Sequence, residues 1–378
     1  MKTSFQIGKI IGIPIKIDVS LLLILALFTW VFATSDYSIY GFVLGFKDVP
    51  VSLTEQLILG AILSVLFFIC VLLHELGHSY VTQRYGYKIS GITLFIFGGV
   101  SQIEEMPKQP RMELTIAVVG PLVSLLLGGF FYVLFLFFSF FSGSMVSQIG
   151  IVTSGTLAFY NVTLGLFNLI PAFPIDGGRV LRAAIARTTD YGRATRIAAN
   201  VGKVFAIGMA VFGFLYYLNI WLILIAVFVY IGASQEAQAT EISIALEDLK
   251  VKDIMTPHVE FVSPDRTLHQ FIDFIHTHRH TSYPVLEHDN LIGIITVMDL
   301  HNIHKTNQDT TYIRDVMHKD VLVISPEEAA NVAFKAMIRH TNERMIVKEN
   351  DKVLGILSWS DLLHAIQLKQ TEKKYMKE

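Results

Sequence analysis

The sequence predicts a polytopic α-helical membrane protein, with about six transmembrane helices and a membrane-associated β-hairpin, followed by a soluble α/β tandem. Hydrophobic residues make up 52% of the 378 residues and charged residues only 16%, whereas soluble proteins average about 25% charged residues. Apolar residues dominate up to about residue 235, and Asp, Glu, Lys and His are frequent in the remainder. The first part is therefore expected to fold in a bilayer and the second in water.

Charge and cysteine content argue against a nucleic-acid-binding protein and against a disulfide-stabilised one. The formal net charge is −2, which gives no reason to expect a nucleic-acid partner. Cys70 is the single cysteine and lies inside an apolar run, so an intrachain disulfide framework is excluded. A buried, unreactive thiol is the interpretation that suits such a position.

Six apolar segments are candidate membrane helices. Residues 13–18, just before the first, alternate between apolar and other side chains, the pattern of a short strand at the membrane surface. A cleaved signal peptide also has an apolar core of roughly 7–15 residues followed by a small residue, so both interpretations of the first segment stay open. The six segments are residues 19–33, 56–80, 114–141, 151–171, 197–218 and 220–233.

The basic residues of the connecting segments predict the topology. Several lie before the first span, between the second and third, and between the fourth and fifth, whereas the other connections hold Lys47 or none. Because Lys and Arg are enriched in cytoplasmic loops, both chain ends and the soluble half are expected in the cytoplasm. The basic residues concerned are Lys2, Lys9 and Lys16; Arg84, Lys88, Lys108 and Arg111; and Arg179, Arg182, Arg187, Arg193 and Arg196.

A His-Glu-Leu-Gly-His motif at residues 74–78 closes the second span, near its cytoplasmic end. His74 and His78 are four apart and lie on one helical face, where two neutral imidazoles can bind zinc. The carboxylate of Glu75 can then handle the proton of the attacking water. An ionisable residue in a membrane helix costs about 2.5–3.5 kcal/mol on insertion scales and usually marks function. The motif therefore predicts a catalytic zinc site.

A catalytic zinc needs a third protein ligand, and Asp176 is the best remaining candidate. It lies in residues 168–179, where two prolines break the fourth span and two glycines allow close backbone approach. Irregular backbone at membrane depth is tolerated where it lines a cavity or is buried in protein. The alternative is a turn whose aspartate caps a helix resuming at Arg179. Spacing alone leaves both interpretations open.

Residues 87–105, between the second and third spans, are too polar and glycine-rich for a membrane helix. Residues 92–100 have the pattern of a β-strand followed by a turn. Such a strand could hold an extended substrate by main-chain hydrogen bonds. A purely structural re-entrant hairpin is the equally suited alternative.

These motifs together resemble the site-2 protease family of intramembrane zinc metalloproteases (M50-like). The resemblance covers about residues 10–235 and rests on the 74–78 motif, the 168–178 segment and Gly120-Pro121. It also includes the glycine pair Gly98-Gly99. The family's activity implies cleavage of a transmembrane segment of a partner membrane protein in the lipid bilayer, with release of a cytoplasmic fragment.

The resemblance also implies residue roles. His74, His78 and Asp176 correspond to the zinc ligands, one Zn²⁺ per chain, and Glu75 to the catalytic glutamate. Asn168 matches an asparagine associated with substrate engagement, for which a helix-packing amide is the alternative. Gly98 and Gly99 are the further substrate-binding candidates.

The second half repeats itself at an offset of 62 residues. Asp253-Ile-Met255 recurs as Asp315-Val-Met317, and residues 293–300 recur as residues 355–362. A repeated α/β unit is expected to pack as an internal pair. The repeats resemble CBS (cystathionine β-synthase) domains. The expected segments are residues 1–235 for the protease domain, 236–248 for a linker, 249–308 and 309–368 for the two repeats, and 369–378 for a tail.

The CBS resemblance implies adenine nucleotide (ATP, ADP or AMP) between the copies. Asp299 and Asp361 would hold ribose hydroxyls with help from Thr296 and Ser358, although helix capping suits these residues too. A histidine cluster precedes the first of these positions. Because no carboxylate or cysteine spacing accompanies the cluster, a solvated helix end is the favoured interpretation. Its members are His276, His278 and His280.

Two alternative functions stay open at this point. A CBS-gated ion channel or transporter would also place a CBS pair beside a membrane domain, but it predicts repeats among the membrane helices, and the sequence has none. A proteolytically inactive relative would bind membrane helices without cutting them, which the intact Glu75 argues against. The sequence is compatible with a homo-oligomer.

Overall fold

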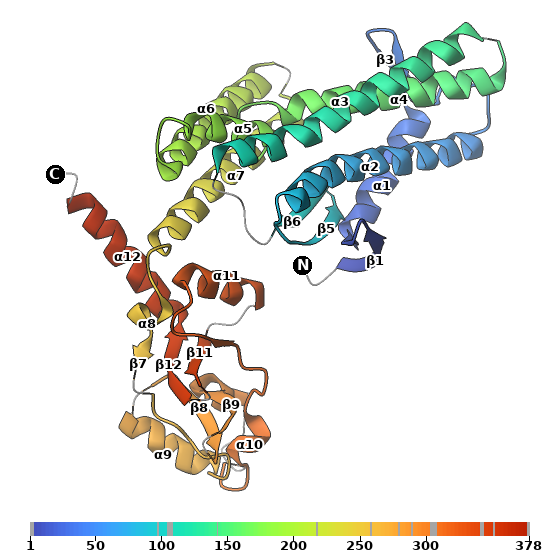
Figure 1. Ribbon diagram of the computed structural model, residues 1–378. Coiled ribbons are helices and arrows are strands. Elements are labelled where there is room, and N and C mark those ends of the chain that lie inside the picture. Colours follow the sequence, from blue (N-terminus) through green and yellow to red (C-terminus); the bar gives the residue numbers. More distant parts are fainter. Residues whose placement is uncertain are drawn as a thin grey trace. The chain divides into compact units, whose positions relative to one another are not determined.

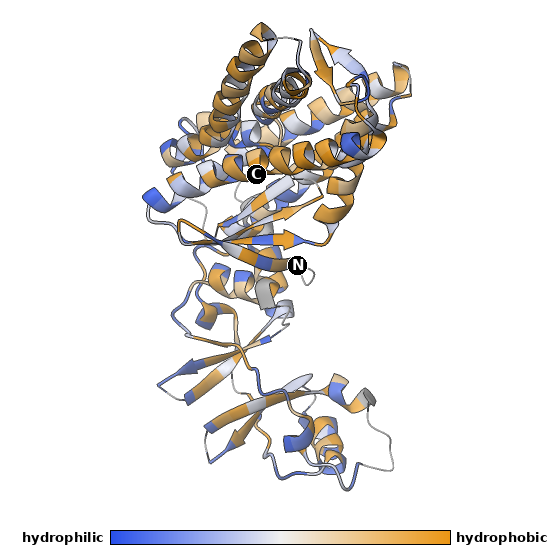
Figure 2. Cartoon of the chain, turned by 90° about the vertical axis from the view of Figure 1, so that its right-hand side faces the viewer, coloured by the Kyte–Doolittle hydropathy of each residue, from blue (hydrophilic) through white to orange (hydrophobic). Residues whose placement is uncertain are grey.

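The chain forms two compact units, residues Met1–Gln238 and Ala239–Glu378 (Figure 1). Its structure, a computed structural model, describes residues 4–375 except 97, 104–108, 142, 217, 258, 279, 289, 303–307, 341–343 and 351. Hydrophobic residues run along the helices of the first unit, whereas the second unit mixes hydrophobic and polar residues (Figure 2). The contrast in composition between the two halves of the sequence thus corresponds to two separately packed bodies.

The first unit is a bundle of helices with a small sheet. Among the described residues, α2, α3, α4, α6 and α7 are long and apolar enough to cross a membrane. The first predicted span forms α1, which is apolar but has 15 residues, fewer than the about 20 that cross a bilayer without adjustment. The polytopic helical architecture is confirmed. The helices are α1 (Ser20–Thr34), α2 (Leu53–Arg84), α3 (Pro110–Phe140), α4 (Met145–Asn168), α5 (Asp176–Ile185), α6 (Tyr191–Leu215) and α7 (Ile220–Ala245).

Helix α2 is the element that carries the His-Glu-Leu-Gly-His motif. It begins at a capping box, in which the Ser52 hydroxyl accepts from the Glu55 amide while the Glu55 carboxylate accepts from the Ser52 amide. Reciprocal capping satisfies donors that the first turn would otherwise leave unpaired. Packing against α1 and α4 buries Leu63 and Cys70 of α2. The single thiol is therefore part of an apolar core, as expected.

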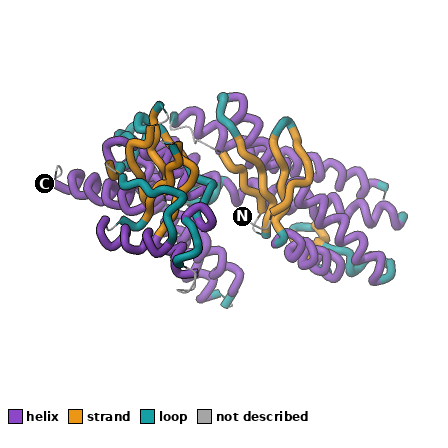
Figure 3. The backbone as a smooth tube through the Cα atoms, turned by 90° about the horizontal axis from the view of Figure 1, so that it is seen from below, coloured by secondary structure: helices purple, strands orange, loops and turns teal. Residues whose placement is uncertain are grey.

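A four-stranded sheet in the order β1-β2-β5-β6 packs on the same helix (Figure 3). Strands β2 and β5 are parallel, and β5 and β6 form an antiparallel hairpin. Ile15 and Ile92 of the sheet are buried against Leu72 and Leu76 of α2. This contact fixes the sheet beside the 74–78 motif. In the strand order, β6 is one of the two edge strands. The strands are β1 (Ser4–Ile10), β2 (Ile13–Asp18), β5 (Ile89–Phe95) and β6 (Gly98–Ile103), with a separate hairpin of β3 (Tyr37–Ile39) and β4 (Phe42–Leu44).

Helix α7 extends further than the hydropathy pattern indicates. The predicted span ends at residue 233, but the helix continues to Ala245, through most of the predicted linker. Residues 234–245 contain no glycine or proline and are rich in Ala, Gln and Glu, which favour helix. The end of the apolar run at residue 233 therefore marks the end of the segment that suits a bilayer. The helix itself continues to Ala245.

The second unit is a pair of α/β repeats with separate cores. The first core gathers Phe271, Tyr283 and Val285, and the second gathers Met337, Val347 and Leu357. The elements of this unit are α8 (Val251–Ile254), β7 (Thr256–Pro257), α9 (Leu268–His278), β8 (Ser282–Glu287), β9 (Asn290–Thr296), the 3-10 helix η1 (Val297–Asn302), α10 (Ile313–Val316), β10 (Val323–Ile324), α11 (Ala330–His340), β11 (Arg344–Glu349), β12 (Lys352–Ser358) and α12 (Trp359–Tyr375).

The repeated glycine and methionine residues interlock the two copies. A β-carbon on Gly293 would lie 2.8 Å from the sulfur of Met317, and one on Gly355 would lie 3.0 Å from the sulfur of Met255. Each copy therefore supplies the methionine that packs on the other copy's glycine. Strand β7 of the first copy also pairs with β12 of the second. This exchange gives a structural reason for the repeated motifs.

Candidate metal centre

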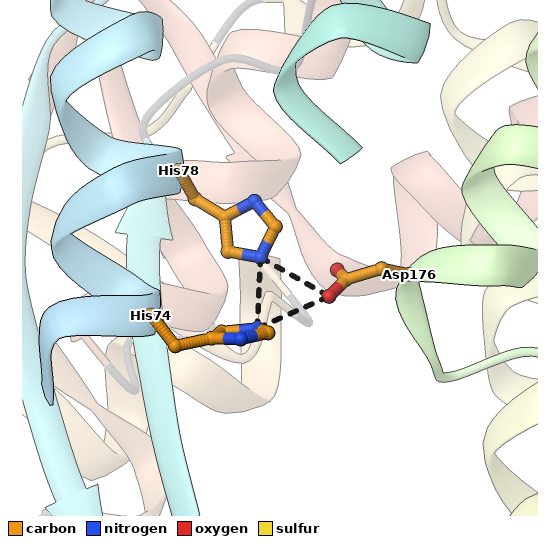
Figure 4. A group of neighbouring side chains, drawn as sticks. All are labelled: His74, His78 and Asp176. Atoms are coloured by element: carbon orange, nitrogen blue, oxygen red, sulfur yellow. Dashed lines mark hydrogen bonds and ion pairs between the residues drawn. The ribbon is translucent and has the colours of Figure 1, made fainter. Parts of the chain in front are cut away.

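Two buried imidazoles face a shared point from one side of α2. His74 and His78 are 4% and 7% exposed, and their Nε2 atoms lie 3.1 Å apart. The i, i+4 spacing places both rings on the same face of the helix. Figure 4 shows the two rings directed toward a single carboxylate.

That carboxylate belongs to Asp176, the first residue of α5. Its Oδ2 atom lies 3.3 Å from Nε2 of His74 and 3.1 Å from Nε2 of His78 (Figure 4). The N-cap of α5 is Ile175, and no side chain caps the helix. The structure therefore directs the aspartate at the histidines and does not use it as a helix cap.

Glycines allow α5 to begin at this point. A β-carbon on Gly177 would lie 2.1 Å from the carbonyl oxygen of Ile170, and one on Gly178 would lie 2.6 Å from the amide nitrogen of Phe173. Any larger residue would push the start of α5 away from the proline-containing turn. Asp176 would move with it.

Helix α3 supports both imidazoles from behind. Nδ1 of His78 lies 2.7 Å from the carbonyl oxygen of Ile116, and Nδ1 of His74 lies 2.9 Å from the hydroxyl of Ser124. Because a carbonyl only accepts, Nδ1 of neutral His78 carries the proton and its Nε2 presents a lone pair. Gly120, between these two α3 positions, has no side chain to occupy the space of the rings.

The three facing atoms have the chemistry and spacing of a zinc site. The set His74, His78 and Asp176 is the one group of potential metal ligands found among the described residues. Tetrahedral zinc with bonds of about 2.0–2.1 Å holds its donors about 3.4 Å apart. The observed separations of 3.1–3.3 Å fit that geometry. Two nitrogens and one oxygen would supply three ligands to a bound zinc, which could then take a water or a substrate oxygen as its fourth.

Glu75 is held by the edge strand of the sheet. The hydroxyl of Ser101, on β6, donates to Oε2 of Glu75 at 2.7 Å, and Ser79 lies 3.1 Å from the same hydroxyl. A β-carbon on Gly99 would lie 2.5 Å from Cγ of Glu75. Strand β6, which begins at Gly98, thus lies directly against the glutamate. No sequence pattern singled out Ser101, because the contact exists only in the folded chain.

Asn168, the last residue of α4, has its side-chain hydrogen bond within its own helix and not with the proposed metal ligands. Its side-chain amide donates to the carbonyl oxygen of Leu164 at 3.0 Å, within its own helix. This contact is the kind expected of a helix-packing amide. A role in substrate engagement stays a prediction.

Comparison with known proteins decides the family. A model described as peptidase family M50 matches residues 62–209, and a CBS domain model matches residues 251–303 and 313–368. A zinc metalloprotease of Methanocaldococcus jannaschii is 37% identical over 374 residues, which cover 99% of this chain and 99% of that protein. The chain belongs to peptidase family M50.

Two further similarities accompany this assignment. The Rip3 protein of Mycobacterium tuberculosis is 30% identical over 381 residues, covering 97% of this chain and 94% of that protein. The solved structure of a site-2 protease from M. jannaschii has 40% identity, a TM-score of 0.44, and covers 62% of this chain and 95% of that chain. The M50 assignment makes the chain a zinc metalloprotease with a CBS pair and does not support the channel or transporter alternative.

Asp299 and Asp361 are the carboxylates that the CBS resemblance singled out. In this metalloprotease each of them caps its own helix. Oδ2 of Asp299 accepts from the amide and the hydroxyl of Thr296, at 2.7 and 2.9 Å. Oδ2 of Asp361 accepts from the amide and the hydroxyl of Ser358, at 2.8 and 2.6 Å. The other oxygen of Asp299 lies 2.9 Å from Nε2 of His318. Capping is thus observed, and ribose binding stays a prediction.

The histidine cluster of the second unit has the character of a helix end. Nδ1 of His278 lies 3.0 Å from the carbonyl oxygen of Phe274, one turn back in α9. Within the described part of the chain, no metal-ligand group forms at His276, His278 and His280. His278 also stacks on the ring of Phe274, and the interpretation of the cluster as a solvated helix end stays a prediction.

Proposed function

We propose that this M50 protein hydrolyses a peptide bond within a transmembrane segment of a partner membrane protein, with His74, His78 and Asp176 holding one Zn²⁺. The observation that carries the proposal is the convergence of two Nε2 atoms and one carboxylate oxygen, 3.1–3.3 Å apart, from α2 and α5. The donors come from helices that belong to an apolar, membrane-type bundle.

Glu75 is the proposed proton carrier. When bound, zinc lowers the pKa of a water toward ~7 and polarises a carbonyl group. Glu75 accepts one proton from the attacking water as the new C–O bond forms, and returns it to the amide nitrogen as the C–N bond breaks. Ser101 keeps the carboxylate beside the centre through its hydroxyl. The net reaction adds one water across one peptide bond.

Replacing Glu75 with Gln tests this role. The variant should bind zinc as the wild type does, because Glu75 is not among the three facing ligands, and cleavage of a co-expressed membrane substrate should fall to background. Full cleavage by E75Q would contradict the assignment. Asp190→Asn serves as a control, because Asp190 caps α6 outside the centre and Asn caps helices as well as Asp does.

Strand β6 is the proposed binding edge for an extended substrate. It is one of the two outer strands of the sheet and lies against Glu75 through Gly99. An extended segment could add to such an edge by main-chain hydrogen bonds, with Gly98 and Gly99 as its partners and Asn168 as a further contact. A substrate helix must first unwind, so Gly, Pro, Asn or Ser near the cut should favour cleavage. Cleavage unchanged by replacing these residues with leucine would contradict the preference.

Cytoplasmic termini and a cytoplasmic CBS pair are proposed from the distribution of Lys and Arg among the connections. The buried single cysteine makes the test simple. In a Cys70→Ser background, a cysteine placed at residue 2 or at residue 370 should react with a membrane-impermeant maleimide only after the cytoplasmic side is opened. Labelling of intact cells at both positions would reverse the proposed topology, and labelling at one position would place that end of the chain outside.

Adenine nucleotide at the CBS pair is proposed as the regulator of cleavage. Its support is the match to the CBS domain model and the repeated Thr296/Asp299 and Ser358/Asp361 arrangement. The second carboxylate oxygen contacts His318 in Asp299 and Thr256 in Asp361, so a ribose would have to replace these contacts. The test adds ATP or AMP to the purified protease in detergent and measures cleavage. A nucleotide effect that disappears in the D299N/D361N double variant supports regulation, whereas an unchanged effect places the nucleotide elsewhere.

A further inference from the structure

One face of α3 contacts both imidazoles of the proposed metal centre and, through Glu113, the helix that carries Asp176. Ile116 and Ser124 contact the two imidazoles, and Gly120 lies between them. Glu113 continues the same face one turn earlier, because residues three or four apart lie together on a helix. It is 3% exposed, and its partner is Arg182 of α5.

Arg182 is enclosed on several sides. It is 1% exposed. Its Nε donates to Oε1 of Glu113 at 2.7 Å, a second guanidinium nitrogen pairs with the same oxygen, and Nη1 donates to Oε1 of Glu236 at 2.7 Å. The guanidinium carbon lies 4.9 Å from the ring centroids of both Phe173 and Tyr191. One side chain therefore joins α5 to α3, α6, α7 and the turn that precedes α5.

Stability alone is a poor reason for such an arrangement. Burying a charge costs several kcal/mol even when it is paired, and buried ion pairs are often replaceable by apolar residues without loss of stability. Arginine suits a positional role, because its planar donors fix direction as well as charge.

The element held by Arg182 is the one that carries Asp176. Helix α5 has ten residues, too few to be stable alone in water, where about 12–15 are needed. Its position therefore depends on its contacts. Gly177 and Gly178 seat its first turn, and Arg182 anchors it six residues after Asp176, a rise of about 9 Å.

We propose that Arg182 is a positioning residue for the metal centre, holding Asp176 in place through α5 as Ile116 and Ser124 hold the two imidazoles. The inference rests on the metal site proposed above. Residues that orient a metal ligand from behind typically change metal affinity 10- to 100-fold when they are replaced, so about this loss is expected here. Glu113 is the main partner, and Glu236, whose side chain is 32% exposed, is the weaker one.

The test measures zinc affinity in the full-length protein in detergent. Metal-free protein is titrated with Zn²⁺ against a chromogenic chelator, and thermal unfolding of the metal-free form is recorded in parallel. The variants are Arg182→Met and Arg182→Lys, and Arg187→Met is the matched control, since Arg187 is exposed two residues beyond α5. We expect R182M to bind zinc about 10- to 100-fold more weakly, R182K to lie between R182M and the wild type, and R187M to match the wild type.

The outcomes separate positioning from general stability. A folded R182M with wild-type zinc affinity and only a lower melting temperature overturns the inference. If R182M does not fold, R182K decides: zinc binding weaker than in the wild type supports the inference, and wild-type zinc binding overturns it. If the wild-type protein itself binds no stoichiometric zinc, the proposed metal site fails and this inference fails with it. That result differs from a loss confined to the Arg182 variants.

Discussion

Gly120 of α3 leaves the space that Nε2 of His78 occupies. A β-carbon at residue 120 would lie 2.1 Å from that nitrogen and 2.7 Å from Nε2 of His74. Contacts this short do not occur between unbonded atoms, so even one methyl group must displace a ring. Even replacement of Gly120 by alanine is therefore expected to disturb the proposed centre.

The Gly120→Ala variant is expected to lose zinc and activity while keeping the helical bundle. Alanine favours helix by about 1 kcal/mol over glycine, so a loss cannot be attributed to a weakened α3. Zinc content by atomic absorption and cleavage of a membrane substrate are the measurements. Gly129→Ala is the control, because Gly129 lies in the same helix with open space around it. A fully active G120A would mean that the rings are placed differently.

Ser101→Ala should slow cleavage without removing zinc. A hydrogen bond to a charged group is worth about 1.5–3 kcal/mol, so we expect turnover to fall about 10-fold or more as Glu75 loses its hydroxyl partner. Single-turnover cleavage and zinc content are the two measurements. Ser79→Ala should have the smaller effect, because Ser79 contacts the Ser101 hydroxyl and reaches Glu75 only through it. Equal effects of the two substitutions would argue against a direct role for Ser101.

Removing the metal should abolish cleavage reversibly. A zinc chelator such as 1,10-phenanthroline is expected to stop the reaction, and added Zn²⁺ should restore it in the wild type. Asp176→Asn replaces a charged ligand with a neutral amide, which is a poorer zinc ligand, and should need far more zinc for any recovery. Restoration of D176N at the wild-type zinc concentration would remove Asp176 from the ligand set.

Acid should destabilise the second unit through Glu327. Salt bridges to Lys250 and Lys252, at 2.6 Å each, hold the pKa of Glu327 at about 2, below its usual 4.5. A carboxyl group with a lowered pKa stabilises the fold above its unfolded pKa. This contribution should therefore be complete above pH 4.5 and lost as the pH falls toward 2. The group is exposed, so salt should weaken the effect.

The measurement is the unfolding midpoint of the second unit against pH. Trp359, which stacks on Phe334, reports on this unit when Trp30 and Trp221 are replaced by Phe. Glu327→Gln should flatten the pH dependence between 4.5 and 2. Glu328→Gln, at the neighbouring exposed position, should leave it in place. Identical profiles for the two variants would contradict the assignment.

Local sequence patterns were sufficient to predict the membrane-type helices and the shared helical face of the two histidines. The i, i+4 spacing of His74 and His78 and the apolar runs follow from helix periodicity and bilayer thickness. The role of Asp176 could not be predicted from spacing, because the spacing was compatible with a metal ligand and with a helix cap. The structure shows that Asp176 faces the imidazoles and that Ile175 is the N-cap.

The supporting residues could not be predicted, because their partners are distant in the chain. Arg182 appears in the sequence as one basic residue among several in a connecting segment, and Ser101 as one polar residue in a strand. Their roles depend on Glu113 and Glu75, which only the folded chain brings near. The length of α7 could not be predicted for a different reason, because hydropathy indicates which residues suit a membrane and not where a helix ends.

The proposed ligands are supplied by two helices that are made at different times. His74 precedes Asp176 by 102 residues, with α3 and α4 in between. A growing chain that has inserted α2 but not yet α5 holds two nitrogens and no third ligand. A chain that has not yet made α5 therefore lacks the complete proposed ligand set.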